Sequence, residues 1–177
     1  ALLQRATQEL LALAESRLDQ GFWAQHEPTI KLRWTVIVDA ARVLLESRRV
    51  DHALKGDSWS AETLLSRYAY GENDAPWAAL DTAQRHLERD AHRFDLDPRR
   101  HDTLHKLIVS ARQRYAASAN ALAKAFVEAY QRARFNLPGQ LLQADVYRRV
   151  VKPALQAGRV AYILVDALRY EMAQELA

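Results

Sequence analysis

The sequence contains no cysteine, a single methionine, and only five glycines and five prolines among its 177 residues. Without cysteine the chain can form neither a disulfide framework nor a thiolate metal site. Its apolar runs are much shorter than the ~18 residues that a membrane span needs, so we expect no membrane partner. Since it also lacks a secretion signal, a cytoplasmic location is the natural expectation.

What the chain does contain is typical of a globular, helix-rich protein. Hydrophobic residues make up 49% and charged residues 27% of it, and the length suits one ordinary domain. The sequence starts at Ala1 rather than at a methionine. We therefore expect it to be part of a longer protein.

Apolar side chains recur at helical spacing through most of the chain, which predicts a mainly α fold. The longest predicted helix begins at Pro98, after the candidate N-cap Asp97, and runs without Gly or Pro until Pro138. At about 1.5 Å per residue it would be ~55 Å long, so it should project or form an antiparallel hairpin. Pro153 should kink or restart a later helix. The other predicted helices cover about 3–20, the region from Pro28 to Leu44, a short stretch from Ser60, 77–91, and a stretch from about Leu141.

The last twenty residues follow a different pattern. Val160–Val165 is an uncharged apolar run, followed by Asp166 and a segment that we predict to be a helix. This pattern is typical of a strand buried on both faces that carries a carboxylate at its C-terminal end. In open α/β sheets that edge holds ligands and metals. One strand cannot form a sheet, so the predicted site requires further residues.

The central part of this segment reads Ile163-Leu-Val-Asp166-Ala-Leu-Arg169-Tyr-Glu171. This sequence resembles the opening motif of the PglZ domain. PglZ proteins are components of BREX bacteriophage-defence systems, and their domain is similar to the alkaline phosphatase superfamily. The resemblance extends more loosely back through Val151–Gly158. It implies a helical docking or scaffold domain over 1–157, followed by the first strand and helix of a truncated α/β domain over 158–177.

The resemblance also implies a site. Asp166 would be a ligand of a divalent metal centre holding zinc, manganese or magnesium, and the nucleophile and other ligands would lie beyond Ala177. The present chain would then contain no catalytic residue, bind no metal tightly and be inactive as an enzyme. Expected partners are other BREX components or a second copy of the chain.

Ordinary structural roles compete with these assignments. Asp166 could instead be the N-cap of the helix that follows it. Arg169 could contact a bound phosphate or form a salt bridge with another segment, and it should diverge from Glu171 because the two are two residues apart on a helix. His101 and His105 have a spacing that suits a metal, but no third ligand is evident.

Charge is distributed unevenly. Residues 1–97 have a net charge of −4, whereas residues 98–135 have a net charge of +6. The basic helix either packs beside acidic neighbours or offers a surface to nucleic acid. In the second case Arg99, Arg100, Arg112 and Arg114 would make weak phosphate contacts without sequence preference, since no interleaved aromatic residues or recognition-helix signature accompany them.

Two further functions compete with the PglZ-type interpretation. The strand could be the Walker B segment of an ATPase, with Asp166 holding Mg²⁺, although Lys55–Ser58 has the wrong order for a phosphate loop and residue 167 is Ala. Alternatively, the chain could be a self-contained helical module that binds nucleic acid.

Overall fold

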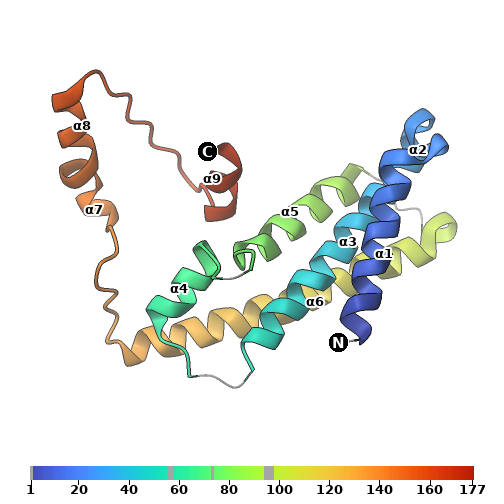
Figure 1. The fold of residues 1–177 in the computed structure, drawn as a ribbon, viewed down its shortest axis with the longest axis horizontal. Coiled ribbons are helices and arrows are strands. Elements are labelled where there is room, and N and C mark those ends of the chain that lie inside the picture. The colour runs from blue at the N-terminus through green and yellow to red at the C-terminus, as the bar shows by residue number, and fades with distance from the viewer. Residues whose placement is uncertain (1, 56–57, 73, 94–97) are drawn as a thin grey trace.

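The chain folds into helices joined by short turns and one long extended segment, as Figure 1 shows for this computed structural model. The structure describes residues 2–55, 58–72, 74–93 and 98–177, with the backbone alone for residues 2–7, 10, 23–24 and 98–102. The predicted mainly α fold is confirmed. The elements are α1 (Leu2–Gln20), α2 (Phe22–His26), α3 (Pro28–Ala53), α4 (Ala61–Ala69), α5 (Ala78–Arg93), α6 (Pro98–Arg132), α7 (Gln143–Val146), a π-helical turn η1 (Tyr147–Val151), α8 (Lys152–Ala157) and α9 (Tyr170–Leu176).

Local sequence signals explain where several helices begin. Pro28 and Pro98 are the first residues of α3 and α6, where a missing N–H costs nothing. Ser60 caps α4, because its hydroxyl accepts a hydrogen bond from the Thr63 amide at 3.1 Å. These three starts agree with the predictions, whereas the predicted cap Asp97 lies outside the described residues.

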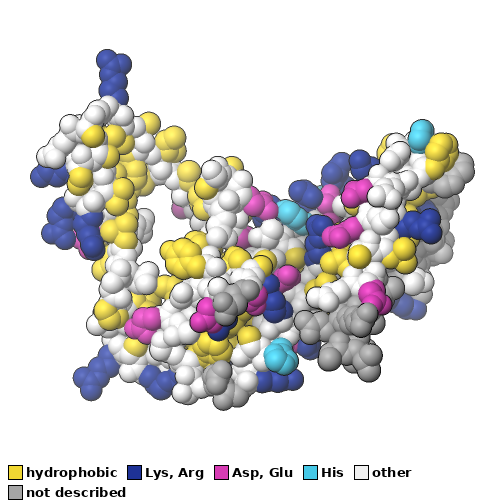
Figure 2. All heavy atoms as spheres, viewed as in Figure 1, with side chains coloured by type: hydrophobic (Ala, Val, Ile, Leu, Met, Phe, Trp, Pro, Cys, Tyr) yellow, Lys and Arg dark blue, Asp and Glu magenta, His cyan; other side chains and the backbone are white. Residues whose placement is uncertain are grey.

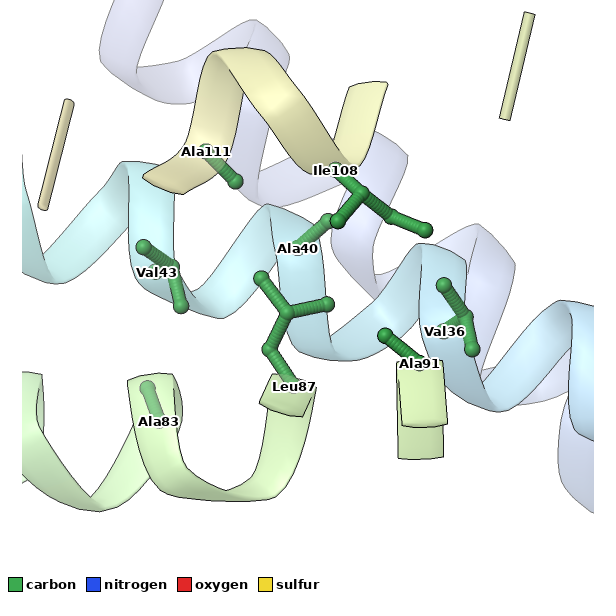
Figure 3. Packing of buried hydrophobic residues seen from close by; sticks show 8 residues of the cluster. All are labelled: Val36, Ala40, Val43, Ala83, Leu87, Ala91, Ile108 and Ala111. Atoms are coloured by element: carbon green, nitrogen blue, oxygen red, sulfur yellow. The ribbon is translucent and has the colours of Figure 1, made fainter. Parts of the chain in front are cut away.

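One hydrophobic core joins α3, α5 and α6, as Figure 3 shows. Val36, Ala40 and Val43 on α3 lie between the side chains of the other two helices. Many of the buried positions are alanines, so the helix axes can approach closely. The α5 and α6 residues of this core are Ala83, Leu87, Ala91, Ile108 and Ala111.

A second core lies where α4 packs onto the later part of α6. Trp77 is 1% exposed and Leu64 is equally buried. The ring of Trp59 meets that of Trp77 edge-on, with centroids 5.6 Å apart. This cluster fixes the short helix α4 and the start of α5, and both elements contribute to the site described below.

Helix α6 is a single uninterrupted helix of 35 residues, so it forms no hairpin within itself. Its first half belongs to the core of α3 and α5, and its second half supports α4. It ends where Arg134 and Phe135 adopt positive φ angles of 51° and 58°, a conformation that a helix cannot continue.

After α6 the chain leaves the body and returns to it (Figure 1). The excursion contains α7, η1 and α8. The π-helical turn has a local cause, because Pro153 has no N–H and its ring would clash with a carbonyl one turn earlier. The predicted restart is thus confirmed, since α8 begins at Lys152 with the proline in its first turn.

The predicted strand is not formed in the described part of the chain. Residues 158–169 form no strand and have no ladder hydrogen bonds, and Ile163 and Leu164 are 77% and 75% exposed. The physical reason is that a strand is stable only when a neighbour satisfies its backbone N–H and C=O groups, and the described residues offer no second strand. The predicted helix does follow, as α9.

Candidate functional site at the docked helix α9

Asp166 lies in an exposed turn between the extended segment and α9. The next residue, Ala167, has a φ of 55°, which is uncommon for a residue with a side chain. Helix α9 has Arg169 at its N-cap position, so the alternative role of Asp166 as that cap is wrong. Within the described ranges, no group of three His, Asp or Glu side chains is placed to hold a metal ion.

Arg169 and Glu171 lie together rather than apart. The Arg169 Nε is 2.7 Å from the Glu171 Oε1, which differs from the predicted divergence. The reason is that Arg169 is in the extended conformation, with φ −75° and ψ 151°, and only Glu171 is helical. The Arg169 guanidinium also lies 3.7 Å from Asp81 on α5, which is the predicted alternative of a salt bridge with another segment.

Asp81 is the centre of this cluster. Its two carboxylate oxygens each accept a hydrogen bond at 2.7 Å, one from the Tyr68 hydroxyl and one from the Tyr115 hydroxyl. Burial and the hydrogen bond to Asp81 raise the pKa of Tyr115 to about 12, and the same causes raise the pKa of Tyr68. Both phenols therefore remain protonated donors at any physiological pH.

The charges in the cluster support one another. Partial burial acts to lower the pKa of the Arg169 guanidinium, but Glu171 and Asp81 outweigh it and raise that pKa. Glu171 is only 1% exposed, and its Oε1 has no partner with hydrogen-bond geometry despite its short distance to Arg169. A buried carboxylate of this kind depends on the arginine beside it.

The rest of α9 fastens the cluster to the body. The Tyr170 hydroxyl and the Gln174 side-chain amide both donate to the carbonyl of Ala69, at 3.0 and 3.2 Å. Near the end of the helix, Glu175 pairs with Arg85, which lowers the pKa of that carboxyl, and lies 3.0 Å from His86. Helix α9 is therefore held at both of its ends.

An apolar cavity of about 350 Å³ adjoins the cluster, between α4, the start of α5 and α6. Asp81 and Tyr68 form its polar wall. The indole N–H of Trp77, which also lines it, has no hydrogen-bond partner in the structure. The remaining lining residues are Leu64, Leu65, Leu80, Ala119, Leu122, Ala123 and Phe126.

A second pair of carboxyls is buried between α3 and α5. Asp39 and Asp90 are 4% and 2% exposed. Burial, together with the adjacent Asp90, raises the pKa of Asp39 to about 6. The hydrogen bond from Arg89 lowers the pKa of Asp90, and Arg93 adds to the effect. Below about pH 6 the two carboxyls thus hold one proton between them, with the negative charge on Asp90.

The predicted nucleic-acid residues of α6 have acidic partners where their side chains are described. Arg112 forms a two-pronged pair with Glu88, at 2.8 and 2.7 Å, and Arg114 pairs with Asp51. This is the arrangement in which the basic helix packs beside acidic neighbours. The side chains of Arg99, Arg100 and His101 lie outside the described residues, and His105 has a buried ring nitrogen without a partner.

Apart from Arg169, the sequence contained no signal for the residues of the Asp81 cluster. Tyr68, Asp81, Tyr115 and Arg169 come from α4, α5, α6 and the N-cap of α9, with no motif linking them. Only the packing of the helices brings them together.

No helix in the described ranges is both long and apolar enough to cross a membrane. No protein-family model, curated protein or solved structure matches the chain.

Proposed function

We propose that this chain is the helical docking region of a PglZ-type protein of a BREX defence system, with the start of a metal-dependent, phosphatase-like domain at residues 158–177. The helical part, residues 1–157, would serve as the scaffold. The observation that carries the proposal is that two consecutive residues of the resembling motif, Arg169 and Tyr170, contact the body, and that the next, Glu171, is buried beside Arg169.

The position of Asp166 agrees with this role. It lies three residues before Arg169, so the anchored cluster limits how far its carboxylate can move from the body. A carboxylate oxygen suits zinc, manganese or magnesium, and a pair of such metals stabilises both the attacking and the leaving oxygen in phosphoryl transfer. The remaining ligands and the nucleophile would come from sequence beyond Ala177.

Arg169 has a double role in this proposal. Its ion pairs with Glu171 and Asp81 position the start of α9, while its side chain is still 53% exposed. A half-exposed guanidinium can form a fork to a phosphate oxygen without giving up those pairs.

The amount of exposed surface supports a docking role. The accessible surface is 12532 Å², whereas a compact monomer of this mass exposes about 8,800 Å². Part of the excess is apolar and lies on residues 160–165. We infer that further sequence of the same protein, other components of the defence system or a second copy cover this surface, in the cytoplasm.

The metal content of a longer protein tests the proposal. We expect a protein that extends past Ala177 to contain a divalent metal by elemental analysis, and Asp166→Asn to lower that content and any phosphoester hydrolysis. Asp145→Asn, a change of the same kind outside the motif, should leave both unchanged. An Asp166→Asn protein with full metal content would refute the assignment, and hydrolysis by the 177-residue chain alone would refute the division of roles.

A further inference from the structure

The excursion between α6 and α9, which we call the arm and define as residues 132–165, stands apart from the body (Figure 1). Its helical elements α7, η1 and α8 follow one another without a break, and most of its side chains are exposed. Figure 2 shows dark-blue basic side chains gathered on it, with yellow hydrophobic ones between them. The arm is therefore a surface whose charge and exposure differ from those of the helical body.

The charge of the arm is strongly positive and largely unpaired. It has six basic residues and one acidic residue, Asp145. Asp145 pairs with Arg148 at 2.7 Å, and Arg132 donates to the Trp59 carbonyl at 3.0 Å. Among the basic side chains of the arm, Arg134, Arg149, Lys152 and Arg159 have neither an ion pair nor a hydrogen bond to any described residue.

In the described part of the body, Arg85, Arg112 and Arg114 each have an acidic partner, whereas Lys31, Arg33 and Lys124 have none and are spread over α3 and α6. On the arm, Arg148, Arg149 and Lys152 share one polar side of the continuous helical stretch Gln143–Ala157, which is roughly 22 Å long at 1.5 Å per residue.

Exposed aromatic rings lie beside these cations in the sequence. Phe135 is 65% and Tyr147 57% exposed. Phe135 follows Arg134, and Tyr147 precedes Arg148. Cations interleaved with exposed aromatic rings form the pattern that binds unpaired bases, because the cations follow the phosphates and the rings stack on the bases. This is the combination that the sequence of α6 lacks.

We propose that the arm binds single-stranded nucleic acid without sequence preference. A duplex hides the faces of its bases, so it would use the charges and leave the rings without a partner. This proposal goes beyond the proposed function as the start of a metal-dependent domain, which we call the metal-domain proposal, and it does not depend on Asp166. A basic helix with exposed apolar residues could also bind an anionic membrane surface. The second test below distinguishes membrane binding from binding of nucleic acid.

The first test measures the anisotropy of a fluorescein-labelled oligo-dT of about 20 nucleotides with the 177-residue chain at several salt concentrations. Neutralising about four phosphates predicts a log–log slope of affinity against salt of about −3 for a single strand. The triple variant Arg149→Ala, Lys152→Ala, Arg159→Ala should bind at least tenfold more weakly, with a slope of about −1. The control triple Lys31→Ala, Arg33→Ala, Lys124→Ala removes the same charge from exposed, unpaired residues of the body and should change neither quantity.

The second test separates stacking from insertion into a membrane. The double variant Phe135→Leu, Tyr147→Leu keeps apolar bulk but cannot stack on a base. It should weaken oligo-dT binding about tenfold, at an unchanged salt slope. The same variant is then tested on vesicles of phosphatidylcholine with about one third phosphatidylserine. If the arm binds membranes, the two leucines should leave its affinity for these vesicles unchanged.

Several outcomes would overturn the proposal. These are no oligo-dT binding by the wild-type chain at about 50 mM salt, equal losses in the arm and control triples, or tighter binding of duplex than of single strand. If the chain binds vesicles but not oligo-dT, and the double leucine variant still binds vesicles, the arm is a membrane-binding surface instead. Asp166→Asn should leave oligo-dT binding unchanged, so the metal-domain proposal and this one can fail separately.

Discussion

The buried carboxyl pair predicts an unusual dependence of stability on pH. Asp39 has a pKa of about 6 in the folded chain, against an ordinary value of 3.8. Between these values the native state binds more protons than the unfolded state, so the free energy of unfolding falls as pH rises from about 4 to about 6. Two pKa units correspond to about 3 kcal/mol, which is the upper limit of the loss.

Asp39→Asn is the variant that tests this reasoning. An amide has the shape of the protonated acid and can donate to Asp90 as the shared proton does. We expect the variant to be more stable than the wild-type chain at pH 7.5, by up to about 3 kcal/mol, and to lose the decline between pH 4 and pH 6.

The assay is urea unfolding followed by circular dichroism at pH 4.5 and pH 7.5, with the exposed Asp19→Asn as a control that keeps the wild-type pH profile. Asp90 affects the free energy of unfolding in a different pH range. Because its pKa is lowered, the stabilisation that it contributes is lost only below about pH 4. A wild-type stability that stays level from pH 4 to pH 6 would refute the account. So would an Asp39→Asn variant that is less stable than the wild type at pH 7.5.

Two further predictions concern the Asp81 cluster. Tyr68→Phe removes one hydrogen-bond donor to the part-buried Asp81 carboxylate and should lower the free energy of unfolding by about 1–2 kcal/mol in urea unfolding. The control Tyr70→Phe, at a residue that is 78% exposed, should leave the free energy of unfolding unchanged. Equal effects of the two variants would show that the hydrogen bond to Asp81 does not stabilise the fold. Glu171→Ala removes the buried partner of Arg169 and should speed amide hydrogen exchange throughout α9 without affecting exchange in α3. If the amides of α9 exchange no faster in the variant, the other contacts of α9 are enough to hold it on the body.

Much of the helical body could be predicted from local sequence. Pro28, Ser60 and Pro98 begin helices because proline and serine suit the first turn for reasons that involve only nearby backbone groups. Apolar residues at helical spacing predicted a helix from Pro28 to Leu44, and α3 buries Val36 and Val43 of that region in the core.

The candidate site could be predicted only in part. The motif identified Arg169 and Glu171 as notable residues, but their pairing depends on the extended conformation of Arg169, which a helical spacing rule does not contain. Asp81 and its two tyrosines meet only through packing. Likewise, the apolar run at 160–165 has the composition of a strand, but composition cannot supply the neighbour with which a strand must pair.

The measurement that most directly tests the central claim is hydrogen exchange at the amides of residues 160–165. Our proposal is that this segment becomes the first strand of a further domain, whereas in the 177-residue chain it is exposed and has no ladder partner among the described residues. Its amides should therefore exchange at once in this chain and become strongly protected in a protein that extends past Ala177. Equally fast exchange in both proteins would contradict the claim.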